Sequence, residues 1–368
     1  MRNNPGVPRT RSPWLLPSEL LLTAALSTTA YAWSHLEFVW VLGGLAAGWL
    51  ATAAFRRVHS VQIPNVRTRQ TGQVLVGVAL GPVLAAQSMG DALPYLPLLL
   101  GAVVAVLFGS VVVARAYSRA CPVDGVTAGL ATLPGGIGIM ASVAAERGAA
   151  APLVALIQGV RITVVVSVIP AILVLRGAEG GTAEAAGSAV LPTNAAGYAW
   201  WAALVAAAFA AAGVARRLGV PVASLLGPMA LGLLAAFALR LLPGDADPLS
   251  LPYLHAVVGQ ALLGITVGEY LAQDSRTSRR AVAGGFAGVL ATFALSLAVA
   301  VVLTAVTPWS FLTCVLMMAP GGAPEMIVLA AATPSELHLV VIAQMTRQVA
   351  VNALMPLWLR IFGSFPST

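Results

Sequence analysis

The chain has 368 residues, of which 59% are hydrophobic and only 9% are charged. A soluble domain has about 25% charged residues, so this composition excludes a soluble globular protein and predicts one that lies in lipid. The apolar segments are long and continuous rather than alternating, which favours membrane-spanning helices over a β-barrel. All 20 basic residues are arginines, mostly at the ends of apolar segments, so the net charge of +7 indicates the positive-inside rule and not nucleic-acid binding.

Twelve apolar segments follow a polar, basic segment at residues 1–13, which we expect to be a cytoplasmic tail. Most of them reach the roughly 20 residues that a membrane-spanning helix needs. A linker rich in Gly, Ala and Glu at 176–196 separates six segments from the other six, which predicts a first repeat over 14–175 and a second over 197–362. The expected segments are 14–34, 38–55, 70–90, 94–115, 122–146, 150–175, 197–214, 221–242, 252–273, 281–306, 309–333 and 335–360.

The second six segments repeat the first six. LGGLAAGWLA at 42–51 matches LGPMALGLLA at 226–235, and GQVLVGVALG at 72–81 matches GQALLGITVG at 259–268. The strongest match pairs PGGIGIM at 134–140 with PGGAPEM at 320–326, and the offset of 186 then continues without a gap. Gln158, Arg161 and Pro170 therefore align with Gln344, Arg347 and Pro356.

Arginines change ends between the two repeats. Arg56 and Arg57 follow the second segment, whereas its copy ends at the acidic loop 243–247. Because arginines mark cytoplasmic ends, the repeats are predicted to be inverted relative to each other. Inversion needs an odd number of crossings, so one segment per repeat must enter and leave by the same face. We therefore predict an all-α membrane protein of a bacterial inner membrane, with five spanning helices and one re-entrant hairpin per repeat and both termini cytoplasmic.

The re-entrant segments are expected to be those with a central Pro-Gly-Gly. Proline removes a backbone donor and glycine frees the backbone, so these triplets break a helix. Free backbone groups at membrane depth need a protein-lined or watery cavity, and the N-terminus of each following half-helix suits an anion. The alternative is a structural kink only. The residues concerned are Pro134, Gly135, Gly136, Pro320, Gly321 and Gly322.

Arg161 and Arg347 lie near the middle of apolar segments, each three residues after a glutamine. Gln158 and Arg161 therefore share one helix face, as do Gln344 and Arg347. A lone arginine at this depth costs roughly 2.5–3.5 kcal/mol on insertion scales. Either each arginine caps carbonyls of the broken helix or pairs with a glutamate, or it contacts an anionic substrate directly, and both roles are compatible.

Three acids lie within or beside apolar segments. Glu325 follows the second Pro-Gly-Gly, where the first repeat has Ile139, and Glu269 stands where the first repeat has Pro82. Burial raises the pKa of a carboxyl group in general, so such an acid can carry a coupling proton, or it can be the ion-pair partner of an arginine. Asp124 is a weaker candidate. Because neither Glu325 nor Glu269 has a copy in the first repeat, we expect a single coupling site.

Other features favour packing over chemistry. Small residues at helical spacing, such as the pair Gly77 and Gly81 and the pair Gly264 and Gly268, predict close helix contacts. Cys121 and Cys314 are expected to be small interior residues. The four histidines are scattered and have no metal-ligand spacing, so we expect neither a metal site nor a cofactor.

The segments LPGGIGIM…LVALIQGVRI…IP at 133–170 and APGGAPEM…LVVIAQMTRQ…MP at 319–356 resemble the AbrB membrane family, a duplicated group of bacterial inner-membrane proteins. The family carries labels such as ammonia monooxygenase and AbrB regulator, and it is distantly similar to antiporters and anion symporters with inverted repeats. The resemblance implies transport and supplies no catalytic residue.

The sequence favours a secondary active transporter of a small, anionic organic solute that works by alternating access and is coupled to a proton or sodium. Its expected partners are that solute, the coupling ion and the lipid bilayer, with no nucleic acid; relatives of this architecture suggest a homodimer. The alternative is a membrane receptor or regulatory protein that binds a ligand without moving it. An enzyme is not expected.

Overall fold

The computed structural model describes residues 12–34, 38–58, 64–87, 94–175, 190–241, 251–273 and 277–365, and this part of the chain consists of helices and their connections, with no strand. Residues 1–11 of the expected tail, linker residues 176–189 and the acidic loop 243–247 lie outside the described residues. The helices are α1 (Leu15–Ser34), α2 (Val39–Val58), α3 (Val66–Ala85), α4 (Leu96–Ala120), α5 (Gly125–Thr132), α6 (Ile137–Glu146), α7 (Ala151–Leu175), α8 (Ala195–Arg217), α9 (Ala223–Arg240), α10 (Tyr253–Leu271), α11 (Arg279–Val306), α12 (Phe311–Met318), α13 (Ala323–Ala331), α14 (Leu337–Ala353) and α15 (Met355–Gly363).

Within the described residues, seven helices are long and apolar enough to cross a membrane: α2, α4, α7, α8, α9, α10 and α11. The protein is therefore a multi-pass α-helical membrane protein, as its composition predicts. The expected segments 122–146 and 309–333 are each two short helices, and the last segment is also divided, into α14 and α15.

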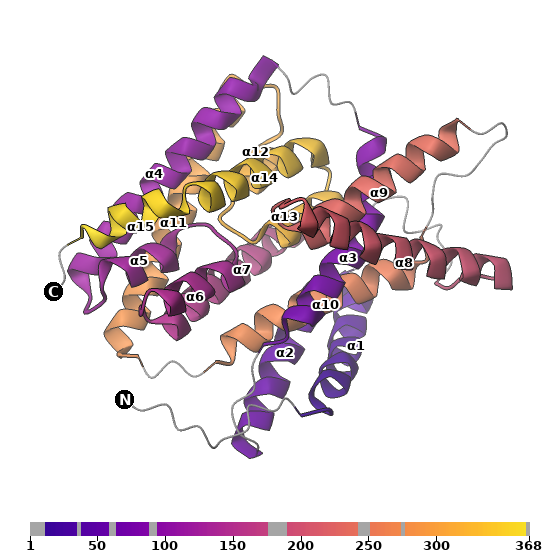
Figure 1. Ribbon diagram of the computed structural model, residues 1–368, viewed down its shortest axis with the longest axis horizontal. Coiled ribbons are helices and arrows are strands. Elements are labelled where there is room, and N and C mark those ends of the chain that lie inside the picture. The colour runs from indigo at the N-terminus through magenta and orange to yellow at the C-terminus, as the bar shows by residue number, and fades with distance from the viewer. Residues whose placement is uncertain are drawn as a thin grey trace.

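The helices form two groups that lie side by side (Figure 1). We call α1–α3 and α8–α10 the panel, and α4–α7 and α11–α15 the hairpin bundle. Most helix contacts fall inside one group, and the two groups meet chiefly where α7 packs on α10 and α2 and where α13 packs on α3. Each group contains helices from both halves of the chain.

The panel is held by two close helix pairs, α2 with α10 and α3 with α9. A side-chain Cβ at Gly264 of α10 would lie 2.1 Å from the carbonyl oxygen of Val41, and one at Gly77 of α3 would lie 2.5 Å from that of Leu225. Only glycine permits backbones to approach this closely. The close packing predicted for the paired glycines is present at both places.

Two other helix pairs, α3 with α10 and α4 with α11, run antiparallel. The backbone N–H of Asn65, just before α3, donates to Glu269 at the end of α10, 2.7 Å away. Farther along, Gly72 of α3 faces the carbonyl of Gly259, near the start of α10. In the hairpin bundle, Arg280 at the start of α11 donates to the carbonyl of Ala120 at the end of α4. Each pair thus joins one helix of the first half to one of the second in opposite directions.

Each pair of short helices folds back on itself. Thr127 Oγ1, in the first turn of α5, accepts a hydrogen bond of 2.9 Å from the N–H of Ala150, which follows α6. In the second half, Thr313 Oγ1 in α12 accepts one of 3.1 Å from the N–H of Glu336, which follows α13. The chain therefore leaves each pair of short helices at the place where it entered.

Candidate functional site

Both Pro-Gly-Gly triplets interrupt a helix. In the first half, Leu133 and Gly136 flank the break with extended backbone, at φ −62°, ψ 130° and φ −74°, ψ 138°. Ala319 and Gly322 flank the second break at φ −51°, ψ 131° and φ −73°, ψ 139°. Because an extended backbone cannot continue the i to i−4 ladder, each break leaves carbonyl oxygens that need other donors.

Arg161 and Gln158 supply donors to the first break. Arg161 is fully buried. Its Nη1 donates to the carbonyl of Leu133 at 2.9 Å and its Nη2 to that of Gly135 at 3.0 Å. Gln158 Nε2 donates to the carbonyls of Leu130, at 2.7 Å, and Leu133, at 2.9 Å. Two residues of α7 thus hold the break open as an ordered loop.

The second break has the same arrangement. Arg347 Nη1 donates to the carbonyl of Ala319 at 2.8 Å and its Nη2 to that of Gly321 at 3.3 Å. Gln344 Nε2 donates to the carbonyl of Leu316 at 2.7 Å, and Gln344 Oε1 accepts a bond from Arg347. The capping role considered for these arginines is therefore present in both halves.

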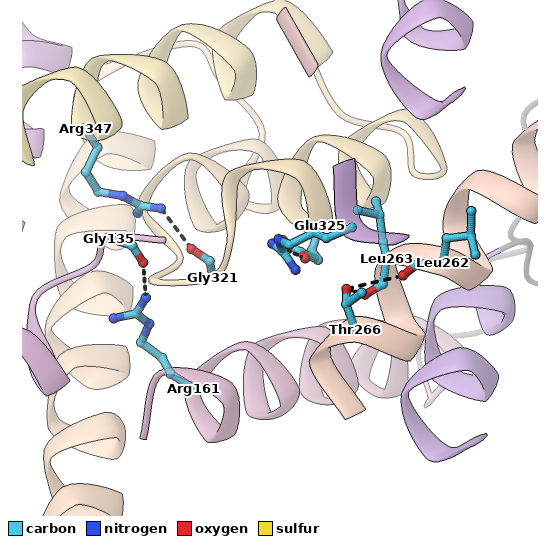
Figure 2. A network of polar contacts seen from close by, with 9 residues as sticks. Gly135, Arg161, Leu262, Leu263, Thr266, Gly321, Glu325 and Arg347 are labelled. Carbon is cyan, nitrogen blue, oxygen red and sulfur yellow. Dashed lines mark hydrogen bonds and ion pairs between the residues drawn. The ribbon is translucent and has the colours of Figure 1, made fainter. Parts of the chain in front are cut away.

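Carbonyl contacts occupy Nη1 and Nη2 of both guanidinium groups but do not neutralise their charge. Among the described residues, neither Arg161 nor Arg347 has a carboxylate within salt-bridge distance. The Nε of Arg161 and the Oε1 of Gln158 are buried and find no hydrogen-bond partner in the part of the chain that the structure describes. Figure 2 shows the two arginines pointing toward each other from α7 and α14, and the guanidinium of Arg161 lies in the field of Arg347. Within the described part of the chain, these two buried guanidinium groups thus have no carboxylate as an ion-pair partner.

Glu325 lies in the first turn of α13, directly after the second break, and is fully buried. Its Oε1 is 2.7 Å from Nη2 of Arg69, a residue of α3. Its Oε2 is close to the backbone of Gly322, where a Cβ would lie only 2.0 Å from it. The ion-pair alternative for Glu325 is therefore present, and the pair joins the hairpin bundle to the panel.

Arg69 was not among the residues singled out from the sequence, because it directly precedes the expected segment 70–90 and resembles a flanking positive charge. The sequence does contain one signal that could have identified Arg69: no arginine occupies the equivalent position in the second repeat. With the offset of 187 that aligns the two GQ motifs, Arg69 matches Ala256, just as Glu325 matches Ile139. Both members of the ion pair thus lack copies in the other repeat.

The remaining acids have structural partners. Glu269 is buried at the end of α10 and accepts the backbone N–H of Asn65, which ties α10 to the start of α3. Asp124 is the N-cap of α5, and its carboxylate accepts the backbone N–H of Thr127 at 2.8 Å. In the described part of the chain, no three His, Cys, Asp or Glu residues are grouped as a metal site would require.

The fold and the site define a class of protein: a multi-pass α-helical membrane protein whose two interrupted helices are bound by buried arginines. A sequence model of the family described as "Transition state regulatory protein AbrB" matches residues 40–363. The chain belongs to the AbrB family. It is similar to "Uncharacterized protein YhjN" of Bacillus subtilis (strain 168), with 27% identity over 349 residues, 88% of this chain and 89% of that protein. No solved structure matches the chain.

Proposed function

We propose that the protein is a secondary active transporter of a small organic anion, coupled to a proton or sodium, in a bacterial inner membrane with both termini cytoplasmic. The observation that carries the proposal is the pair of interrupted helices with facing guanidinium groups, which no carboxylate of the described residues neutralises. Interrupted helices at the interface of repeats are where secondary transporters bind their substrates.

Inverted repeats are supported by the helix directions. The aligned motifs make α3 equivalent to α10, and the order of the segments in the two repeats makes α4 equivalent to α11. Both pairs run antiparallel. The glycine contacts are also exchanged, because Gly264 meets Val41 of the first half just as its copy Gly77 meets Leu225 of the second. A two-fold axis in the membrane plane produces this exchange.

Re-entry of the short helices is supported by their lengths. Helices α5, α6, α12 and α13 have 8, 10, 8 and 9 residues. At 1.5 Å per residue each extends about 12–15 Å, half of a hydrocarbon layer of about 30 Å. Because each pair also returns to its starting point, we infer that the two hairpins enter from opposite faces and that their Pro-Gly-Gly tips lie near mid-membrane.

An anionic solute is supported by the charge balance around the tips. Arg161, Arg347 and Arg69 contribute three positive charges and Glu325 one negative charge, which leaves +2. Helices α6 and α13 begin at the tips, and their N-termini add partial positive charge. A bound anion would offset the electrostatic cost of burying this net positive charge.

Alternating access is supported by the division into panel and hairpin bundle. Contacts are extensive inside each group and sparse between them. We infer that the hairpin bundle moves relative to the panel and carries the tips with it. The family description names a regulatory protein, which keeps a ligand-binding receptor as the second candidate.

Uptake into proteoliposomes tests the carrier. We expect labelled lactate or succinate to accumulate inside proteoliposomes with the wild-type protein when a proton or sodium gradient is imposed. Arg161→Gln and Arg347→Gln should reduce uptake about tenfold or more, since a hydrogen bond to a charged group contributes about 1.5–3 kcal/mol. Arg360→Gln, an exposed arginine in α15, is the matched control. If a ligand stabilised the protein but no uptake occurred under either gradient, the carrier would be rejected in favour of the ligand-binding receptor.

A further inference from the structure

The ion pair between Arg69 and Glu325 has geometry that a purely structural pair lacks. Glu325 is fully buried, yet within the described part of the chain neither of its oxygens accepts a geometrically sound hydrogen bond. Arg69 contacts it through Nη2, and the buried Nη1 of Arg69 has no partner among the described residues. A free carboxylate can bind both arms of a guanidinium, which is the stronger arrangement. The carboxylate of Glu325, which is attached to the chain, contacts the guanidinium of Arg69 through Nη2 alone.

The place itself suits an anion. It lies at the N-terminus of α13, where Gly322 leaves room for Glu325 Oε2 that a Cβ would fill. The side chain of Arg69 is 15% exposed, whereas that of Glu325 is not exposed at all. Arg69 is therefore the partly exposed member of the pair and Glu325 the enclosed one.

We propose that Arg69 is an anion-binding residue of this protein, that a small carboxylate replaces the Glu325 carboxylate opposite it, and that the replacement requires Glu325 to take up a proton. The inference rests on the proposed carrier in treating this place as the solute site. Two carboxylates opposite one guanidinium would repel each other, and protonation of Glu325 removes that repulsion. One solute carboxylate therefore binds together with one proton, and the coupling ion is H⁺.

The groups that face Glu325 are consistent with one exchangeable negative charge. The helices packed on α13 are α3, α7, α12 and α14. Helix α3 contributes Arg69, α7 contributes Arg161 and α14 contributes Arg347, while α12 has no charged side chain. From α10, Tyr270 lies in the field of both Arg69 and Glu269. Since Ile139 and Ala256 replace the pair in the other half, the site is single.

Titration calorimetry of purified protein with lactate, between about pH 5.5 and pH 8, tests the proposal, because lactate stays ionised over this range. For the wild type, the affinity should fall by about tenfold per pH unit on the alkaline side, since one proton binds with each lactate. Glu325→Gln should bind lactate with an affinity that does not depend on pH and is at least about tenfold higher than that of the wild type at pH 8.

Arg69→Gln alone leaves a buried charge unpaired and can fail to fold. The double variant Arg69→Gln, Glu325→Gln removes both charges, so it should fold and bind no lactate. Arg67→Gln, two residues away and exposed, is the matched control and should bind as the wild type does.

Three results would overturn the proposal: an unchanged pH dependence in Glu325→Gln, lactate binding to the double variant, or no lactate binding by any protein at any pH. Uptake of another anion by proteoliposomes in the last case would preserve the carrier and reject only this site. Proton-linked lactate binding without any uptake would preserve the site and reject the carrier.

Discussion

The buried arginines have two opposing effects on stability. Arg161 satisfies the carbonyl of Gly135, which has no other hydrogen-bond donor among the described residues, and shares the carbonyl of Leu133 with Gln158. Leaving one buried carbonyl unsatisfied costs about 1–3 kcal/mol. A lone guanidinium in the membrane interior costs roughly 2.5–3.5 kcal/mol. These terms are of similar size, so fold stability alone gives little reason for an arginine at this position.

Replacing Arg161 by methionine, which is unbranched and has no charge, should therefore change the stability only slightly. We expect Arg161→Met to change the free energy of unfolding by less than about 2 kcal/mol. SDS-driven unfolding of the purified protein measures this change, with Arg360→Met in α15 as the exposed control. A loss of more than about 4 kcal/mol would assign Arg161 to the fold.

At the residue scale, the sequence could predict the symmetric part of the site. Gln158 and Arg161 could be located because duplication repeats them at an exact offset and because polar residues in apolar segments are conspicuous. Their carbonyl partners follow from the break, because its freed oxygens need donors. Arg69 could not be found in this way, because its role depends on α3 crossing α13, a contact between distant segments of the chain.

At the element scale, local chemistry explains what was predictable. Proline and glycine act on their own backbone, so the breaks after Thr132 and Met318 could be placed from the sequence. The choice of packing partner is not local. Helix α2 packs on α10, more than 190 residues away in the chain, and the sequence shows only that both carry small residues at helical spacing.

The contact of α2 with α10 leads to a prediction about Gly264. A Cβ there would lie 2.1 Å from the carbonyl oxygen of Val41 and 2.9 Å from the backbone nitrogen of Leu45, neither of which can move without shifting α2. We expect Gly264→Ala to lower the free energy of unfolding by about 1–3 kcal/mol, the usual cost of overpacking. SDS-driven unfolding measures this change.

The matched control is Gly101 in α4, where a Cβ meets nothing within 4 Å. Gly101→Ala should leave stability unchanged or raise it by up to about 1 kcal/mol, because alanine is the better helix former. If both variants lost the same amount, backbone flexibility rather than helix approach would be the property that these glycines supply.

At the scale of the whole molecule, the panel and the hairpin bundle each combine helices from both halves, so neither is a unit of the sequence. The duplication could be read from the printed residues, but this division could not. It follows from which helices bury their faces together, and it places the ion pair of Arg69 and Glu325 across the boundary between the two groups. In the proposed carrier, solute binding would change the charge of this pair at the contact between the two groups.

Fixing this boundary should stop transport. A Cβ at Gly159 of α7 would lie 3.2 Å from the Cδ2 of Leu271 of α10 and 3.9 Å from its backbone nitrogen, which brings two cysteines at these positions within range of a disulfide. In the variant Gly159→Cys, Leu271→Cys, oxidation with copper phenanthroline should abolish solute uptake by proteoliposomes, and dithiothreitol should restore it. The variant Gly43→Cys, Ser27→Cys is the control, because it links α1 to α2 inside the panel, where a Cβ at Gly43 would be 3.1 Å from that of Ser27. Its oxidation should leave uptake intact.

Undiminished uptake by the oxidised Gly159→Cys, Leu271→Cys protein would show that the two groups move as one body. The solute would then have to cross by motion of the hairpins alone.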